Sequence, residues 1–185
     1  MRFGSPKALA TIGSHKAIEF LQKKLLESLV AEIIIVTGAY ETLIKPYVFN
    51  HSKVHVVHNK DYKLGQTCSF QTGLLAVDKN TKGVLLLPVD CPFVLTRTVN
   101  GLMEHFHQKN PDILIPVYHG KRGHPPIFHQ RMRQDLLNLP ADKGINGLSH
   151  WHQAQTIETN DPGVIATFNT QKELEGYLKT MTLAL

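Results

Sequence analysis

The segment GVLLLPVD, residues 83–90, decides the fold because it joins a run of apolar residues to a single acidic one. A short, continuous apolar run of this kind is typical of a strand that is covered on both faces of a parallel sheet. An acidic residue at the end of such a strand is costly unless it is paired or bound to a cation. Asp90 is therefore a candidate Mg²⁺ ligand, and the alternative is a capping aspartate in the turn before Cys91 and Pro92.

Further strands and helices alternate on both sides of this segment. Strands are predicted at residues 32–37, 53–58, 83–89, 112–117, 126–129, 155–159 and 163–166. Helices are predicted at residues 14–30, 41–48, 67–77, 96–108, 131–139, 143–151 and 170–178, with Ser14, Thr96 and Thr170 as N-caps. This alternation predicts an α/β protein with three layers and a mainly parallel sheet. No repeat or linker interrupts it, so residues 1–185 are expected to form a single domain.

The composition narrows the class of function. The chain has 185 residues, 42% of them hydrophobic, and a net charge of +5, which suits an anionic partner such as a nucleotide. Its basic residues are scattered and not interleaved with aromatics, so no nucleic-acid partner is expected. No apolar run is long enough to span a membrane and no leader is evident; two cysteines make no disulfide framework. A cytoplasmic protein is expected.

Four more segments carry groups that can bind a ligand. Gly38 ends the strand at residues 32–37, at the sheet edge where α/β proteins bind ligands. Residues 2–7 combine small and basic side chains, residues 59–73 contain a helix start with hydroxyl groups after Gly65, and residues 121–126 form a rigid basic loop. The last three have structural alternatives, respectively a loose chain end, an ordinary capped helix and a solvent-exposed turn.

Taken in order, these pieces are similar to a known family. The chain resembles the MobA-like nucleotidyltransferases and, among them, the molybdenum-cofactor cytidylyltransferases. The matching stretches are RFGSPKALATIG (2–13), EIIIVTG (32–38), GQTCSFQTGL (65–74), LLLPVDCPFV (86–95), ILIPVYHGKRGHPPIF (113–128), LPADKGINGL (139–148) and DPGVIATFNTQKEL (161–174). They cover nearly the whole chain, and the most specific feature is an aspartate after an apolar strand, then the Gly-His-Pro loop, then a Gly-x-x-x-x-x-Asn-Thr stretch.

The resemblance implies transfer of a nucleotidyl group, with CMP from CTP favoured, to a phosphorylated acceptor such as the molybdopterin cofactor, with release of pyrophosphate. It implies Mg²⁺ as cofactor and a molybdoenzyme as a candidate recipient of the product. The residues that match the family's catalytic positions are Arg2, Lys7 and Asp90. Those that match nucleotide-binding positions are Gly4, Pro6, Lys7, Gly38, Gly65, Thr67, Cys68 and Ser69. Arg122, Gly123, His124 and Pro125 match the acceptor side, and Asp90 and Asn169 match the metal ligands.

The chain departs from the family pattern in two places. Asn169 stands where the family has an acidic metal ligand, and an amide oxygen can bind Mg²⁺ but brings no charge. The sequence also begins at the arginine of the family's phosphate-binding loop, so a Rossmann-like αβα fold without the family's first strand is expected. A misassigned start, a shortened chain and a natural loss all fit this. A catalytically impaired nucleotide-binding or cofactor-handover protein and a sugar-phosphate nucleotidyltransferase are the alternative functions.

Overall fold

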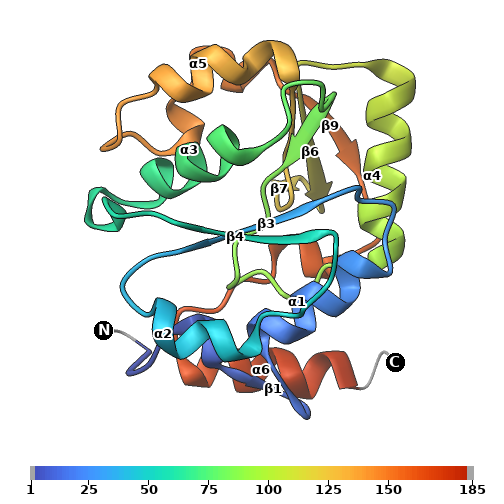
Figure 1. Ribbon diagram of the computed structural model, residues 1–185. Helices are drawn as coiled ribbons and strands as arrows, with labels where there is room; N and C mark the ends of the chain where they lie inside the picture. Colours follow the sequence, from blue (N-terminus) through green and yellow to red (C-terminus); the bar gives the residue numbers. More distant parts are fainter. Residues whose placement is uncertain (1–2, 183–185) are drawn as a thin grey trace.

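The computed structural model describes residues 3–182 and shows a three-layer αβα arrangement (Figure 1). The strands are β1 (Thr11–Ile12), β2 (His15–Lys16), β3 (Ile33–Thr37), β4 (Val54–His58), β5 (Gly83–Leu85), β6 (Ile113–Tyr118), β7 (Lys121–Arg122), β8 (Ile127–His129) and β9 (Gln155–Glu158). The α-helices are α1 (Ala17–Leu26), α2 (Glu41–Ile44), α3 (Gln66–Ala76), α4 (Thr96–Lys109), α5 (Arg133–Asn138) and α6 (Gln171–Thr182). Within residues 3–182, no helix has both the length and the apolar content that a membrane crossing requires.

The sheet is mixed: two pairs of strands are parallel and three are antiparallel among residues 3–182, apart from the small β1–β2 hairpin. β3 pairs with β4 in parallel, from Ile33 opposite Val54 to Thr37 opposite His58. β6 pairs in parallel with β9, and β8 runs antiparallel between β5 and β6. The short β7 folds back on β6 as a hairpin. The expected Rossmann-like class is therefore confirmed, with β7 and β8 as its antiparallel strands.

Strand pairing divides this sheet into two parts among residues 3–182. β3 pairs only with β4, while β5 belongs to the part built on β6 and β8. In a parallel ladder, alternate residues of a strand direct their peptide groups to one neighbour, so Ile34 and Val36 present theirs to the edge away from β4. The strand predicted at residues 83–89 is correspondingly short, because its ladder comes from β8 alone and ends near the bond from Leu86 N–H to the Pro126 carbonyl (3.0 Å).

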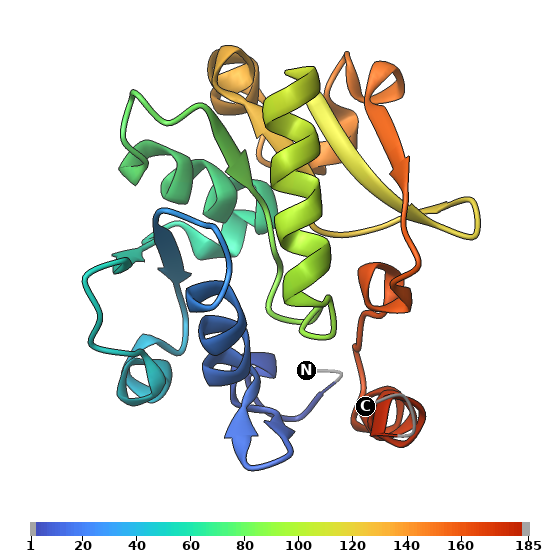
Figure 2. The same ribbon diagram turned by 90° about the vertical axis from the view of Figure 1, so that its right-hand side faces the viewer.

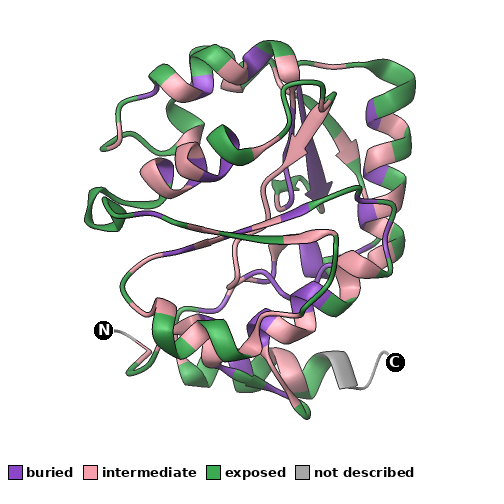
Figure 3. Ribbon diagram, in the orientation of Figure 1, coloured by how far each residue is buried: buried purple, intermediate pink, exposed green. Residues whose placement is uncertain are grey.

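The continuous apolar runs are explained by helices on both faces. On β6, the side chains of Ile113 and Ile115 pack with α3 and α5, whereas Leu114 packs with α4. On β3, Ile33 and Ile35 pack with α1 and α4. Figure 2 shows α1 and α4 on the same side of the molecule, and Figure 3 shows the buried residues gathered on the central strands and on the inner faces of the helices. Successive residues of a strand face opposite sides, so a strand covered on both faces needs no polar alternation.

Two of the predicted elements are wrong. The segment 143–151 is not a helix but contributes to two separate 3₁₀ turns, Ile145–Gly147 and Trp151–Gln153, because Gly144 and Gly147 interrupt it. The segment 163–166 is not a strand but belongs to the 3₁₀ helix Pro162–Ile165, whose first turn is held by Asp161. The proline at its start and the carboxylate that caps it favour a tight turn over an extended strand.

The helix caps are partly as predicted. The Thr170 cap of α6 is confirmed: Thr170 Oγ1 accepts from the Glu173 N–H (3.2 Å), and Glu173 Oε2 accepts from the Thr170 N–H (3.0 Å). Ser14 is not a cap, because it lies in the turn between β1 and β2 and α1 begins after Lys16. Thr96 is not one either, since it is the first residue of α4 and the N-cap is Leu95, whose N–H donates to the distant carboxylate of Asp161.

Replacement of Gly163 by alanine should destabilise the fold, because a Cβ there would lie 2.3 Å from the Phe93 carbonyl oxygen. Overpacking of this kind costs about 1–3 kcal/mol. Gly101 is the matched control, since it lies in α4 with open space around its missing Cβ, and Gly101→Ala should stabilise the helix by about 0.5–1 kcal/mol. Urea unfolding of both variants measures the difference. Equal midpoints for Gly163→Ala and the unmodified protein would contradict this close packing against Phe93.

Candidate functional site

Three residues from distant parts of the chain meet at one ammonium group. The Lys7 Nζ lies 2.6 Å from Asp90 Oδ2 and 2.8 Å from Asn169 Oδ1. The sequence predicts all three as site residues, and the structure brings them into direct contact. Arg2, the fourth residue predicted for catalysis or metal binding, lies outside the described residues.

Lys7 is placed by a short turn near the start of the chain. Pro6 precedes the 3₁₀ turn Lys7–Leu9, which is closed by a bond from the Leu9 N–H to the Pro6 carbonyl (2.8 Å). Ala8 in this turn is buried in the cluster that contains Ile18 of α1. Gly4, at a positive φ of 77°, turns the chain before Pro6. The backbone of this segment therefore rests on α1 while the Lys7 side chain reaches Asp90.

Asp90 lies at the end of the extended chain that follows β5, as the apolar run predicts. Its carbonyl accepts from the Phe168 N–H (3.1 Å), which fixes the distance between Asp90 and the segment that carries Asn169. The next residues are held from the other side by Lys24 of α1, whose Nζ donates to the carbonyls of Pro92 (3.1 Å) and Val94 (2.9 Å). The Cys91 thiol beside Asp90 is buried, and burial raises its pKa, so it stays protonated and inert.

The segment 161–169, called here the strap, connects the remaining parts of the site. Asp161 is buried and its Oδ2 accepts from the Leu95 N–H (2.8 Å) and from Thr98 Oγ1 (2.7 Å). The Val164 carbonyl in the strap accepts from the His124 N–H (2.7 Å). Gly123 is required beside it, because a Cβ there would lie 2.2 Å from the same carbonyl oxygen. The strap therefore sets the positions of the Asp90 loop, the His124 loop and Asn169 together.

Glu173 is a site residue that sequence reasoning treats only as part of a helix cap. Its Oε2 accepts from the Asn169 N–H (2.6 Å) as well as from the Thr170 N–H, and these bonds lower the pKa of the carboxyl group. The attraction of Lys7 acts in the same direction. The capping-box spacing is the signal that could have placed Glu173 beside Asn169.

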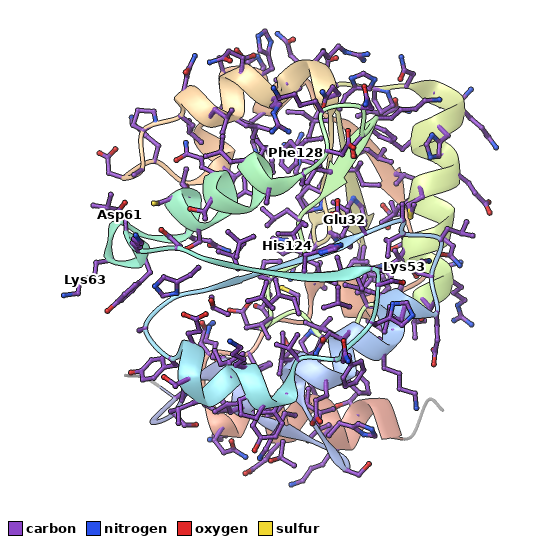
Figure 4. The ribbon with its side chains drawn as sticks, in the orientation of Figure 1. Glu32, Lys53, Asp61, Lys63, His124 and Phe128 are labelled. Carbon is purple, nitrogen blue, oxygen red and sulfur yellow. The ribbon has the colours of Figure 1, made fainter. Side chains whose placement is uncertain are left out.

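The imidazole of His124 lies near the centre of the molecule (Figure 4). Burial lowers its pKa, against the opposing effects of the Asp90 carboxylate and of a hydrogen bond to the Leu86 backbone. Its Nδ1 is buried and has no hydrogen-bond partner among the described residues. Gly123 and His124 contact the strap at Val164, which holds this loop beside the site. The guanidinium of Arg122, by contrast, is turned outward and donates to the Trp151 carbonyl (3.2 Å).

The predicted nucleotide-binding residues at the start of α3 form a second polar group, around Asn59. Asn59 is buried at the end of β4 and its Nδ2 donates to Ser69 Oγ (3.0 Å), while its Oδ1 lies near Cys68 Sγ (3.7 Å). The Asp61 N–H also donates to Asn59 Oδ1 (2.9 Å). The sequence places Asn59 only at the start of the candidate segment 59–73 and gives it no role of its own, although its place directly after the strand VHVVH is a signal of the same kind as Asp90.

Three other predicted nucleotide-binding positions are explained by local structure. Thr67 is buried and its Oγ1 donates to the Lys143 carbonyl (2.5 Å), so it fastens α3 to the turn beyond α5. Gly65 has a φ of 111°, which allows the chain to enter α3. A Cβ at Gly38 would lie 2.7 Å from the Tyr62 Cβ, so this glycine permits close packing of the loops after β3 and β4.

The chain belongs to the MobA-like NTP transferase domain family, which matches residues 1–157. It is similar to the molybdenum cofactor cytidylyltransferase of Escherichia coli (strain K12), with 26% identity over 110 residues, 60% of this chain and 55% of that protein. The chain thus spans about half the length of this curated relative.

Solved structures that share the fold include two of particular interest. One is Rv0371c from Mycobacterium tuberculosis H37Rv in complex with manganese, with a TM-score of 0.80 and 19% identity, covering 97% of this chain and 94% of that one. The other is the 4-diphosphocytidyl-2C-methyl-D-erythritol synthase of Anaerococcus prevotii DSM 20548, with a TM-score of 0.75 and 14% identity, covering 96% and 92%. At these identities the likeness establishes the fold.

The stability of the site should depend on pH through Lys24. Burial lowers the pKa of Lys24 from 10.5 to about 8, against the attraction of Asp161 and Glu27. Between pH 8 and 10.5 the unfolded chain binds more protons at this position than the native protein, so the free energy of unfolding rises with pH. The stability of the unmodified protein, relative to Lys24→Met, should therefore increase across this window.

Lys23→Met is the control, because Lys23 is the exposed neighbour of Lys24 on the same helix. Chemical unfolding of the three proteins at several pH values between 8 and 10.5 measures the effect. A constant difference between the unmodified protein and Lys24→Met across this range would show that Lys24 is not the titrating group.

Proposed function

We propose that the protein is a Mg²⁺-dependent nucleotidyltransferase that transfers a nucleotidyl group, CMP from CTP, to a phosphorylated small-molecule acceptor and releases pyrophosphate. The observation that carries this proposal is that Lys7, Asp90 and Asn169 converge beyond the carboxyl end of β5. This is the edge of an α/β sheet where ligands bind. Membership of the family supports an NTP as the substrate.

The residues present fit a divalent cation at this point. Asp90 and Asn169 offer two oxygens, the ligand atoms that Mg²⁺ prefers, and the Lys7 ammonium already stands between them as a cationic group. Within residues 3–182, no cluster of three or more His, Cys, Asp or Glu side chains is arranged to hold a metal. Few protein ligands suit Mg²⁺, which usually keeps water and substrate phosphate oxygens in its shell. When bound, the ion would neutralise phosphate charge and orient the triphosphate.

The chain's own residues then contribute charge and position. An acceptor phosphate oxygen attacks the α-phosphorus, one P–O bond forms, and the bond to the leaving pyrophosphate breaks. Negative charge grows on the equatorial oxygens and on the leaving group, where Lys7 and Arg2 would stabilise it. No protein nucleophile is needed, which agrees with the inert, protonated thiol of Cys91. The loop from Gly123 to Pro125 would face the acceptor, and the group around Asn59, Cys68 and Ser69 would face the nucleotide.

Cytidylyl transfer to molybdopterin is the specific reaction that we propose. Its support is the sequence similarity to the Escherichia coli cytidylyltransferase, together with a structural relative whose product is also a cytidylyl compound. A molybdoenzyme would then be the partner that receives the finished cofactor. Manganese in the Mycobacterium tuberculosis relative supports a divalent cation of this size.

The uncharged Asn169 favours a second candidate, a nucleotide-binding protein that hands over a cofactor without catalysing transfer. With one carboxylate in the pair, the protein contributes a single negative charge to the cation. The two functions differ in whether pyrophosphate is released.

Asp90→Ala should lower metal-dependent pyrophosphate release by about a hundredfold or more, because the charged ligand of the proposed cation is lost. Asp135→Ala, which removes an exposed carboxylate from α5, should retain the normal rate. The assay is pyrophosphate release from CTP and Mg²⁺ with acceptor. Unchanged turnover in Asp90→Ala would remove Asp90 from the site.

Pyrophosphate release from CTP and Mg²⁺ should appear when molybdopterin is supplied and be absent without it. The physical reason is that the attacking oxygen belongs to the acceptor and no side chain of the site replaces it. Sugar phosphates supplied at the same concentration are the control acceptors. Equal release with sugar phosphates would refute the cofactor assignment, and no release with any acceptor would favour the handover protein.

A further inference from the structure

We infer that Lys7 makes binding of the divalent cation depend on the triphosphate, because its ammonium holds the cation's place until phosphate oxygens draw it away. This inference rests on the proposed function, since it concerns the same cation and the same nucleotide. It adds that the triphosphate binds before or together with the cation, and that Lys7 occupies the cation's place until then.

The geometry shows that the ammonium and a metal ion compete for the same two oxygens. Lys7 Nζ is within hydrogen-bond distance of Asp90 Oδ2 and of Asn169 Oδ1, at 2.6 and 2.8 Å. A magnesium ion would need to lie about 2.0–2.1 Å from those oxygens. Two cationic centres cannot share this space, because at a separation of a few ångströms their repulsion is large in a partly desolvated site.

The charges show why the cation alone binds poorly. The positive charge of Lys7 offsets the negative charge of Asp90, and Asn169 adds none, so these three residues together offer an approaching cation no net charge. The Glu173 carboxylate beside them is not a free ligand, because its Oε2 accepts from the N–H groups of Asn169 and Thr170. When a triphosphate arrives, its oxygens supply new negative charge for both the metal and the displaced ammonium.

The structure also lets Lys7 leave without disturbing the two ligands. The Lys7 side chain is 29% exposed and flexible, whereas its turn is held by Ala8 packed against α1. Asp90 stays in place through the bond of its carbonyl to the Phe168 N–H, and Asn169 stays through the bond of its N–H to Glu173. Movement of the side chain alone therefore frees both oxygens for the cation.

Mn²⁺ binding without nucleotide, followed by electron paramagnetic resonance, tests the inference directly. Lys7→Met and Lys7→Gln keep a side chain of similar length but remove the charge, and both should bind Mn²⁺ about tenfold more tightly than the unmodified protein. Lys23→Met removes one positive charge elsewhere and should bind as the unmodified protein does. Asp90→Asn, introduced into Lys7→Met, should abolish the gain. Melting temperatures of the two Lys7 variants show that both are folded.

The outcomes separate this inference from the proposed reaction. Equal Mn²⁺ affinity in both Lys7 variants and the unmodified protein would overturn the inference, as would a gain that survives Asp90→Asn. Turnover by the unmodified protein alongside such a result would leave the transferase proposal intact. Conversely, tighter Mn²⁺ binding in the Lys7 variants with no turnover by the unmodified protein would support the role of Lys7 and refute the transfer reaction.

Discussion

The buried carboxylate of Asp161 is the interaction on which the arrangement of the site depends. It accepts hydrogen bonds from the Leu95 N–H, from Thr98 Oγ1 and, through its other oxygen, from the Gly163 N–H (2.8 Å). A buried carboxylate is stable only when such donors replace the water that it loses. These bonds fix the start of α4 against the strap, and the strap in turn carries Val164, Phe168 and Asn169 to their partners.

The same arrangement explains why the site is built from loops and yet is well defined. The strap meets the Asp90 loop at Phe168 and the Gly-His-Pro loop at Val164, and both contacts use backbone groups. Gly123 and Gly163 allow this close approach because neither has a Cβ. Lys24 of α1 also holds the Asp90 loop, because its Nζ donates to the carbonyls of Pro92 and Val94. Burial of this charged group is unfavourable, and it lowers the pKa of Lys24. The polar residues therefore converge on Lys7 through a framework of main-chain hydrogen bonds.

The two polar groups of the protein, one around Lys7 and Asp90 and the other around Asn59, lie at the ends of different parts of the divided sheet. β3 and β4 end at the loops that carry Gly38 and Asn59, while β5, β6, β8 and β9 form the part that leads to Asp90 and the Gly-His-Pro loop. α1 shares one hydrophobic cluster with Ile33 and Ile35 of β3 and with Val94 and Val164 of the loops around the site. α3 lies against Val36 of β3 at Gly73, and its Phe70 and Leu74 pack with Ile113 and Ile115 of β6. Hydrophobic packing by α1 and α3, rather than strand pairing, thus links the two groups among the described residues.

Sequence alone predicted the elements whose pattern is set by burial. The apolar run at residues 32–37 predicted a buried strand, the run at 83–89 predicted a strand that forms over Gly83–Leu85, and the spacing of Thr170 and Glu173 predicted the start of α6. It could also place Asp90 at a sheet edge, because a carboxylate that ends an apolar strand is stable only where it meets a partner or a cation. Sequence reasoning failed at residues 143–151 and 163–166, where glycine, proline and a side-chain cap override the local pattern.

Only the tertiary structure decided which residues meet. Lys7 and Asn169 are 162 positions apart, and Asp161 bonds Leu95 and Thr98 at the start of a helix that begins 65 residues earlier in the sequence. Periodicity reports which face of an element is buried, but it carries no information about contacts between residues far apart along the chain. The amino-acid sequence by itself therefore determined the fold class and the candidate ligand-binding edge. The packing of α1, the strap and the Asp90 loop decided that one lysine would lie between the two candidate metal ligands.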